Sequence, residues 1–193
     1  MACHGYGQLA PAFADALEPL RSESRVVAVP EALSRFYLDD PAKRHGPDSP
    51  IGASWMTRED REREIADYVA YLDQVADTLA REIGSRELRV VALGFSQGAA
   101  TACRWAASGS TRIARLVVWG GTLPKDLPDA RGDALFRGAA VTLVGGRKDK
   151  LATPDALEQD QRALSERGIA VSLVWHDGGH SLSSGTLREI AAQ

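Results

Sequence analysis

Cysteine is scarce in this sequence, and long hydrophobic runs are absent. Cys3 and Cys103 are the two cysteines among 193 residues; they form no metal-type cluster, and a reduced cytosolic chain is the simplest interpretation. No window approaches the roughly 18 apolar residues that a membrane-spanning helix needs. The first residues also lack the charged and apolar regions of a signal peptide. We therefore expect a cytoplasmic protein without stable membrane insertion.

The chain also lacks an excess of charge of either sign. Its 26 acidic and 23 basic residues give a net charge of -3, and the two signs are interspersed. Because no basic face is evident, we do not expect nucleic acid as a partner. The composition, 44% hydrophobic and 25% charged, is that of a globular protein with a full core. The length fits a single domain over residues 1–193.

Short apolar runs alternate with helical patterns along the chain. The runs of strand length cover residues 25–29, 88–93, 116–119, 141–144 and 171–175. The helical patterns cover approximately residues 57–84, 97–107, 154–167 and 186–192. Continuous β-branched runs predict a mostly parallel sheet that is buried on both faces. The fold class is therefore α/β, a three-layer sandwich in which ligands bind beyond the carboxyl ends of the strands. Residues 41–54 are interpreted as a surface loop.

One junction between a strand and a helix carries the pattern G-x-S-x-G. Gly94-Phe95-Ser96-Gln97-Gly98 follows an apolar run and precedes an alanine-rich helical stretch. In such an elbow the glycines permit a sharp, strained turn that exposes the serine hydroxyl. Ser96 is therefore the candidate nucleophile. The alternative is a tight turn with an ordinary serine.

A serine nucleophile needs a base and, behind the base, an acid. Two of the four histidines follow Ser96 in the chain. His176 continues the alternation of the last strand, whereas His180 lies in a glycine-rich loop beyond it, so we favour His180 as the base. The acid should lie between nucleophile and base and follow a strand, which favours Asp149. The weaker candidates are Asp126, Asp129, Asp133, Asp155, Asp160 and Asp177.

An oxyanion hole needs two preorganised N–H donors. The amide of Gln97, directly after the nucleophile, is one candidate. The early segment His4-Gly5-Tyr6-Gly7-Gln8 has the glycine content of an oxyanion loop, and the amide of Tyr6 is the second candidate. His4 is then expected to be a structural residue of this loop.

Together these pieces resemble the phospholipase/carboxylesterase family of α/β-hydrolases, which includes bacterial carboxylesterases and acyl-protein thioesterases. The matching segments are His4-Gly5-Tyr6-Gly7, Ser54-Trp55-Met56, Gly94 to Ala99, Gly146 to Asp149 and Gly178-Gly179-His180. The resemblance implies cleavage of carboxylic esters or thioesters through an acyl-enzyme on Ser96, with Asp149 and His180 completing the triad. It implies Tyr6 and Gln97 as oxyanion donors, a small-molecule substrate, no metal and no organic cofactor.

The substrate pocket is expected to be lined by Trp55, Met56 and Phe36. Met56 stands where the family has an aromatic residue, which changes the shape of the pocket. Short-chain esters are favoured over long lipids because no long amphipathic lid is evident in the sequence.

The start of the chain departs from the family, in which a full strand and a preceding hairpin lead into the His-Gly loop. Here Met1-Ala2-Cys3 precede His4, and three residues span at most about 10 Å. We therefore expect that N-terminal strands are missing, through truncation or a start codon assigned too late. The strand at 25–29 would then lose its neighbour, leaving backbone groups unpaired unless the sheet closes up.

Two other functions fit parts of the sequence. A hydrolase fold without activity, serving as a binding module, would show the same motifs. Gly5 to Ala10 also fits G-x-G-x-x-A, with Glu31 further along, which is the outline of a dinucleotide-binding fingerprint. The full strand that this fingerprint requires is absent, and it leaves Ser96, Asp149 and His180 unexplained.

Overall fold

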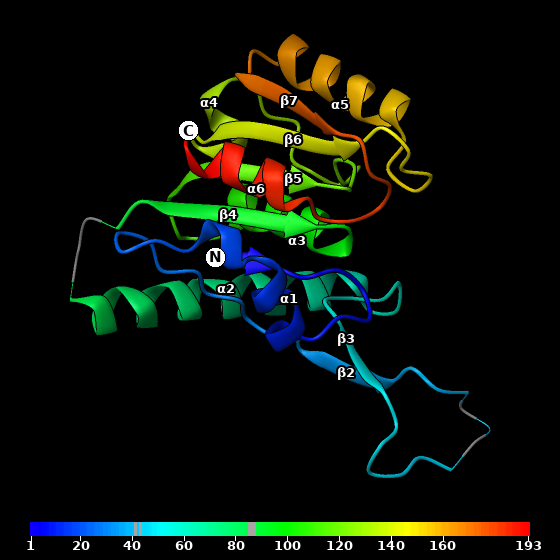
Figure 1. Ribbon diagram of the computed structural model, residues 1–193. Helices are drawn as coiled ribbons and strands as arrows, with labels where there is room; N and C mark the ends of the chain where they lie inside the picture. Colours follow the sequence, from blue (N-terminus) through cyan, green and yellow to red (C-terminus); the bar gives the residue numbers. More distant parts are fainter. Residues whose placement is uncertain (41, 43, 85–87) are drawn as a thin grey trace.

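Five parallel strands form the central sheet of the computed structural model, which describes residues 1–40, 42, 44–84 and 88–193. Their order is β1-β4-β5-β6-β7 (Figure 1). The strands are β1 (Ala2–Cys3), β4 (Val90–Phe95), β5 (Ile113–Trp119), β6 (Ala140–Gly146) and β7 (Val171–His176). The four long strands lie at the last four of the five apolar runs, so the strands predicted there are confirmed. The predicted parallel sheet is confirmed as well.

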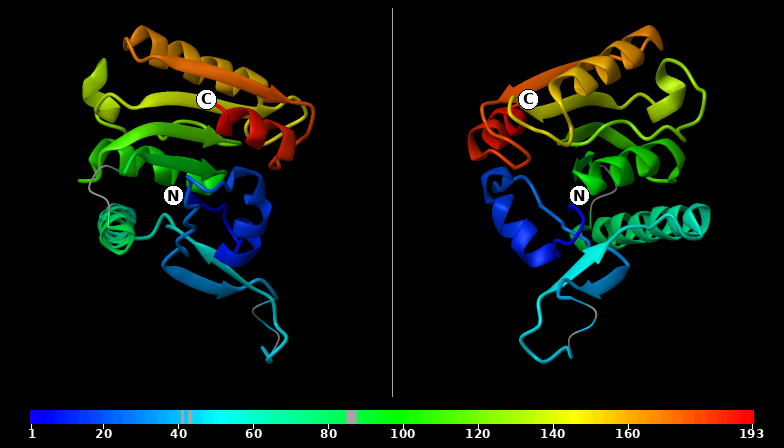
Figure 2. Two further views of the ribbon diagram at one scale, coloured as in Figure 1. Left: turned by 60° about the vertical axis from the view of Figure 1, so that its left-hand side comes forward. Right: turned by 90° about the vertical axis from the view of Figure 1, so that its right-hand side faces the viewer.

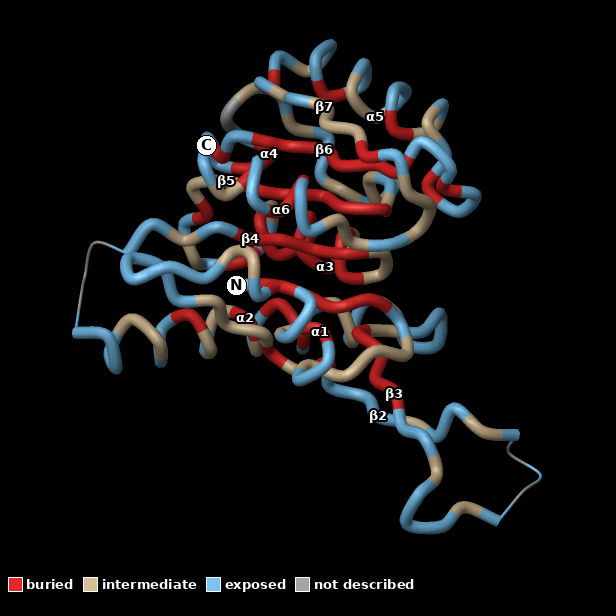
Figure 3. The backbone as a smooth tube through the Cα atoms, viewed as in Figure 1, coloured by how far each residue is buried: buried red, intermediate tan, exposed pale blue. Residues whose placement is uncertain are grey.

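Helices cover both faces of the sheet and give three layers (Figure 2). One face carries α2 (Arg61–Ile83), α3 (Gln97–Ser108), the short α4 (Asp133–Phe136) and α5 (Pro154–Glu166). The other carries α1 (Ala10–Ala16), a 3₁₀ turn (Glu18–Leu20) and α6 (Ser184–Ala191). The central strands are buried along most of their length (Figure 3), which explains their continuous apolar runs. None of the described helices has the length and apolar character that crossing a membrane requires.

The predicted helix boundaries agree with the structure to within a few residues. The long helix α2 ends as expected at Gly84, whose φ of 70° places it in the left-handed region that glycine tolerates. Its start, at Arg61, lies four residues after the predicted residue 57. Asp60 makes no capping bond with its side chain; instead the Glu64 carboxylate accepts a hydrogen bond from the Thr57 amide at 2.6 Å.

Residues 25–29 do not form the predicted strand. Among the described residues, their backbone contact with β1 is one hydrogen bond, from the amide of Ala2 to the carbonyl of Ala28 at 2.8 Å. Arg25 pairs with Ser22 in an isolated bridge. A neighbour of two residues offers too few backbone groups for a second ladder, so this segment stays irregular and Val26 is 62% exposed.

An antiparallel hairpin lies outside the central sheet. It consists of β2 (Ser34–Tyr37) and β3 (Ile51–Ser54), and it projects from the body of the molecule in Figures 1 and 3. The interpretation of 41–54 as a loop is therefore wrong for 51–54, because pairing with β2 makes that segment a strand. Pro41 and Lys43 lie outside the described residues.

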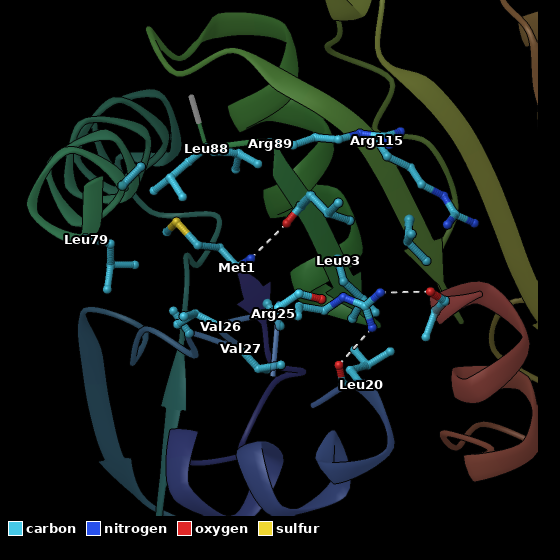
Figure 4. A pocket seen from close by; sticks show the side chains of 18 of the residues that line it. Met1, Leu20, Arg25, Val26, Val27, Leu79, Leu88, Arg89, Leu93 and Arg115 are labelled. Atoms are coloured by element: carbon cyan, nitrogen blue, oxygen red, sulfur yellow. Dashed lines mark hydrogen bonds between the residues drawn. The ribbon is translucent and has the colours of Figure 1, made fainter. Parts of the chain in front are cut away.

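A cavity of about 630 Å³ lies beside the amino-terminal half of β4 (Figure 4). Its walls are largely apolar and include Val26, Val27, Leu79, Leu88 and Val91. The amino group of Met1 reaches it and donates a hydrogen bond to the carbonyl of Val91 at 2.8 Å. The residues described along its walls include none of the site residues predicted above, so this cavity is separate from the candidate active site.

Candidate active site

Ser96 occupies a strained turn between β4 and α3. Its φ of 55° and ψ of −118° lie in a region that residues with side chains rarely adopt. The turn is possible because Gly94 and Gly98 have no side chains. A Cβ on Gly94 would collide with the carbonyl of Gly98, and one on Gly98 would collide with the carbonyl of Cys3. The turn therefore presents Ser96, partly exposed, at the carboxyl end of β4.

A chain of hydrogen bonds joins Ser96, His180 and Asp149. Nε2 of His180 lies 2.9 Å from Oγ of Ser96, and Nδ1 lies 2.8 Å from Oδ2 of Asp149. An ionised carboxylate can only accept hydrogen bonds, so Nδ1 carries the ring proton and Nε2 is left to accept the serine hydroxyl. In this protonation state a histidine can act as a general base.

Backbone hydrogen bonds beyond β6 and β7 bring the acid and the base together. The amide of Arg147 donates to the carbonyl of His176 at 2.8 Å, and the amide of Lys148 donates to the carbonyl of Gly178 at 3.0 Å. A Cβ on Gly146 would collide with the carbonyl of Gly178. The two loops therefore pack backbone against backbone, which only glycine permits at this position.

The carboxylate of Asp149 is held on both of its oxygens. Its side chain is 1% exposed, and Oδ1 accepts hydrogen bonds from the amides of Leu151 at 2.8 Å and Ala152 at 3.1 Å. Oδ2 is therefore left for His180, and the carboxylate cannot rotate away without losing both amide contacts.

The ring of His180 is fixed by its surroundings as well as by its hydrogen bonds. The ring of Phe95 lies 5.0 Å from it between centroids. Gly120 packs beside the imidazole, since a Cβ there would lie 3.5 Å from the ring, an ordinary van der Waals distance; its φ of 56° is what favours glycine at this position. The indole of Trp119 donates to the carbonyl of Ser181 at 3.1 Å, which anchors the loop.

His4 has the structural role that was expected of it. It is fully buried, its Nδ1 lies 2.8 Å from the carbonyl of Gly5, and its Nε2 accepts from the amide of Ala32 at 3.0 Å. One nitrogen donates and the other accepts, so the ring is neutral. Burial also lowers the pKa of His4, which favours the same neutral form of the ring.

The loop after β1 uses its backbone groups in hydrogen bonds at almost every residue. The side chain of Gln8 accepts from the amide of Gly5 at 2.7 Å. The amide of Gly7 donates to the carbonyl of Ala53 at 2.9 Å, and the amide of Ala53 donates to the carbonyl of Gln8 at 3.2 Å. The role of the Gln8 side chain was not predicted; its position three residues after Gly5, as in a turn, was the signal.

The two backbone amides predicted as oxyanion donors make no hydrogen bond among the described residues. The amide of Tyr6 has no acceptor within the described part of the chain. Gln97 begins α3, so its amide has no partner within the helix. A Cβ on Gly5 would lie 3.3 Å from Cβ of Ser96, which places the loop of Tyr6 directly against the nucleophile.

The three residues predicted to line a substrate pocket differ in how far they are buried. The ring of Phe36 is partly buried and lies 5.0 Å from the ring of Tyr6 between centroids. Met56 is also partly buried. Trp55 is 1% exposed, and its indole N–H donates to the carbonyl of His4 at 2.9 Å. We therefore correct the role of Trp55 from a pocket wall to a support beneath the loop.

Among the weaker acid candidates whose side chains are described, none makes a hydrogen bond with His180. Asp126 forms an ion pair with Arg104 at 2.9 Å, and the hydrogen bonds from that guanidinium lower the pKa of Asp126 to about 2. Asp160 accepts a hydrogen bond from a backbone amide at 2.7 Å, and the side chain of Asp177 is 97% exposed. The side chain of Asp133 lies outside the described part of the structure. Asp149 is therefore the acid that the geometry supports.

His176, the histidine that was not favoured as the base, is buried within the fold. Its ring is 5.7 Å from that of Trp119 between centroids, and its Nδ1 accepts from the amide of Gly178 at 3.1 Å. Within the described residues, no three histidine, cysteine, aspartate or glutamate side chains are grouped so that they could hold a metal ion.

Glu31, which a dinucleotide fingerprint would assign to a ribose, has a structural contact instead. Its Oε2 accepts from the amide of Ala10 at 2.7 Å, at the start of α1. Its other oxygen lies 3.3 Å from Nε of Arg35. The structure therefore gives no support to the dinucleotide interpretation.

Comparison with known sequences finds one relative of moderate similarity, while no family model matches the chain. The "Putative hydrolase MhqD" of Bacillus subtilis (strain 168) is 31% identical over 126 residues. These residues are 64% of this chain and 56% of the relative, so the match spans little more than half of the relative's length.

Solved structures match nearly the whole chain. A carboxylesterase from Mesorhizobium loti has a TM-score of 0.71 and 15% identity, covering 99% of this chain and 86% of that one. The Bacillus cereus carboxylesterase has a TM-score of 0.70 and 18% identity, covering 99% and 84%. Acyl-protein thioesterase 2 of Zea mays has a TM-score of 0.68 and 18% identity, covering 99% and 89%. These likenesses confirm the predicted α/β-hydrolase fold, and they are to the same group of proteins that the sequence motifs resemble.

Proposed function

We propose that the protein is a serine hydrolase that cleaves carboxylic esters or thioesters through an acyl-enzyme on Ser96. The observation that carries this proposal is the hydrogen-bonded chain from Ser96 through His180 to Asp149, with distances of 2.9 and 2.8 Å. These residues follow three different strands of one sheet edge. A strained, partly exposed serine within hydrogen-bond distance of an imidazole is the arrangement that nucleophilic catalysis needs.

In the first half of the reaction, Oγ of Ser96 attacks the carbonyl carbon while Nε2 of His180 takes the hydroxyl proton. The carbonyl oxygen becomes an oxyanion, which the amides of Tyr6 and Gln97 stabilise by hydrogen bonds. The negative charge of Asp149 stabilises the imidazolium. The carbonyl then re-forms, the bond to the alcohol or thiol breaks, and the leaving group receives the proton from His180.

In the second half, water attacks the acyl group on Ser96. His180 takes a proton from the water, and a second oxyanion forms in the same position. When it collapses, the bond to Oγ breaks and His180 returns the proton to Ser96. The products are a carboxylic acid and the regenerated hydroxyl.

We propose small-molecule esters or thioesters with short acyl chains as substrates. Tyr6 is 61% exposed and Leu38 49% exposed, and Leu38 lies against Gly7, where a Cβ would be 3.4 Å from its Cδ2. With Phe36, whose ring lies 5.0 Å from that of Tyr6 between centroids, they form an open apolar surface on the loop whose Gly5 packs against Ser96. An open surface leaves much of a long acyl chain exposed to water. Each added methylene of the substrate therefore contributes less binding free energy than the roughly 0.8 kcal/mol expected for full burial. In a series of nitrophenyl esters, kcat/KM should be highest for short chains; a steady rise to dodecanoate would contradict this.

A cytoplasmic location and one domain over residues 1–193 remain part of the proposal. Cys3 and Cys103 are both free and buried. Burial raises the pKa of the Cys3 thiol to about 12 and raises that of Cys103 as well, so neither thiol is poised to react. Free, unreactive thiols agree with a reducing compartment.

Labelling with a fluorophosphonate tests the proposed nucleophile. Wild-type protein should be labelled and should hydrolyse nitrophenyl esters, and Ser96→Ala should do neither. Ser181→Ala, which removes an exposed hydroxyl next to His180 in sequence, is the matched control and should retain both activities. Labelling that persists in Ser96→Ala would exclude Ser96 as the nucleophile. Folded wild-type protein that is not labelled would favour a binding module without activity.

A further inference from the structure

The side chain of Gln97 joins the nucleophile turn to the end of β3. Its Nε2 donates to Oγ of Ser54 at 3.0 Å and to the carbonyl of Met56 at 2.9 Å. Its Oε1 accepts from the amide of Trp55 at 3.1 Å. Both polar atoms of the carboxamide are therefore engaged, and all of their partners belong to one three-residue segment.

The strand that ends in this segment is tied to the loop of Tyr6. Ala53 exchanges two backbone hydrogen bonds with the loop, at 2.9 Å from the amide of Gly7 and at 3.2 Å to the carbonyl of Gln8. Gly52 packs so closely that a Cβ there would lie 2.6 Å from the carbonyl oxygen of Gly7. The end of β3 therefore contacts the oxyanion loop on one side and Gln97 on the other.

Trp55 makes a second connection to the same loop. Its indole N–H donates to the carbonyl of His4 at 2.9 Å, and the two rings lie 5.3 Å apart between centroids. The backbone amide of Trp55 is the group that Oε1 of Gln97 holds. The position of the Trp55 backbone relative to α3 therefore depends on Gln97.

We propose that the carboxamide of Gln97 is a positioning group for hydrolysis: it fixes the loop that carries the Tyr6 amide relative to Ser96. This inference rests on the proposed function and adds to it. The two oxyanion donors belong to segments that are far apart in the chain, so their spacing depends on contacts between those segments. Oxyanion donors act at about 2.7–3.1 Å, and a displacement of about 1 Å can cost a factor of about 100 in rate.

The loop should remain folded without Gln97, because Ala53 and Trp55 still hold it. What changes is its placement relative to the turn at Ser96. The expected defect is therefore in stabilisation of the transition state and not in binding of the substrate.

Gln97→Met tests the proposal, because it removes all of these hydrogen bonds and keeps an unbranched side chain of similar length. The kcat for a short nitrophenyl ester, per site titrated with fluorophosphonate, should fall about 10- to 100-fold. The KM should stay within about threefold, as for loss of an interaction made only in the transition state. Affinity for a trifluoromethyl ketone, which forms an oxyanion adduct on serine, should fall by the same factor as kcat/KM.

Two further variants complete the design. Thr111→Val removes the 2.7 Å hydrogen bond from Thr111 to Asp73, beyond the other end of α3; it should lower the melting temperature and leave kcat per site unchanged. Ser54→Ala removes one acceptor of the Gln97 carboxamide and should cause a smaller loss of kcat. The double variant with Gln97→Met should be no slower than Gln97→Met alone, because both act on one network.

The outcomes separate this inference from the proposed function. A kcat per site of Gln97→Met within about twofold of wild type, or a loss equal to that of Thr111→Val, overturns the positioning role and leaves the esterase proposal standing. A wild-type protein that is neither labelled nor active overturns both. Should Gln97→Met not accumulate as folded protein, the same measurements on Ser54→Ala decide, and an unchanged kcat and ketone affinity would then overturn the inference.

Discussion

The carboxylate of Asp149 lies 2.8 Å from Nδ1 of His180 and is almost completely buried. Its second oxygen is taken by two backbone amides. The imidazole therefore meets an acceptor with one fixed orientation, which determines the nitrogen that carries its proton. This pairing makes Asp149 separable by experiment from the other acidic residues of the chain.

Asp149→Asn should lower kcat by about 10⁴-fold with little change in KM, because an amide at this position can hold the wrong tautomer of His180. Nitrophenyl ester turnover per titrated site measures the effect. Asp177→Asn, which changes a side chain that is 97% exposed, is the matched control and should be fully active. Equal activity of the two variants would show that Asp149 is not the acid.

Ser96→Gly should be more stable than Ser96→Ala by about 1 kcal/mol, because glycine adopts the observed φ of 55° without the strain that a Cβ causes. Both variants should be inactive, so the comparison isolates backbone strain from chemistry. Urea denaturation measures the difference in unfolding free energy. Equal or greater stability of Ser96→Ala would mean that the turn is not strained.

Asp73 should make the stability of the fold depend on pH in strongly acidic solution. It accepts hydrogen bonds from the indole of Trp105 at 2.8 Å and from the amides of Ser110 and Thr111 at 2.6 and 3.0 Å. Burial alone would raise its pKa, but these bonds lower it from 3.8 to about 2. A lowered folded-state pKa contributes stability above the unfolded-state value and loses it as the pH falls.

Asp73→Asn should therefore destabilise the protein by about 2 kcal/mol at pH 7, through loss of hydrogen bonds to a charged acceptor. The difference in unfolding free energy between this variant and the wild type should shrink as the pH falls from about 4 to about 2. Urea denaturation at a series of pH values measures it. A difference that is constant down to pH 2 would rule out the charge of Asp73 as the cause.

The ion pair between Arg104 and Asp126 should stabilise the fold without serving the reaction. Its two hydrogen bonds are 2.9 and 3.0 Å long, and the side chain of Arg104 is 10% exposed. Asp126→Ala should lower the free energy of unfolding by about 3 kcal/mol, because it leaves the buried guanidinium of Arg104 without its carboxylate partner. Adding Arg104→Met should recover part of this loss, as thermal and urea denaturation would show. A fall in kcat per titrated site in Asp126→Ala would instead link this residue to catalysis.

The residues brought together at the candidate site could be predicted because each of them follows a strand. In a parallel sheet the carboxyl ends of the strands meet at one edge. The position of each residue after a strand, together with the order nucleophile, acid, base along the chain, was therefore enough to predict Ser96, Asp149 and His180. The acid was the least determined of the three, since turns favour aspartate in any case. The structure distinguishes Asp149 through its amide contacts and its burial.

The elements that could not be predicted depend on partners that are distant in sequence. The apolar run 25–29 has the composition of a strand, but β1 is too short to pair with it. Residues 51–54 lack a clear alternation and form a strand because β2 lies beside them. The side chain of Gln97 sits at a variable position of G-x-S-x-G, and its partners at 54–56 come from a separate hairpin.

The cavity beside β4 has a practical consequence for inhibitor searches. Its lining is separate from the residues around Ser96, so a compound that fills it would stabilise the folded chain by mass action and leave hydrolysis unchanged. A raised melting temperature is therefore insufficient evidence that a compound occupies the candidate active site. Protection of Ser96 from fluorophosphonate is the readout that separates the two modes of binding.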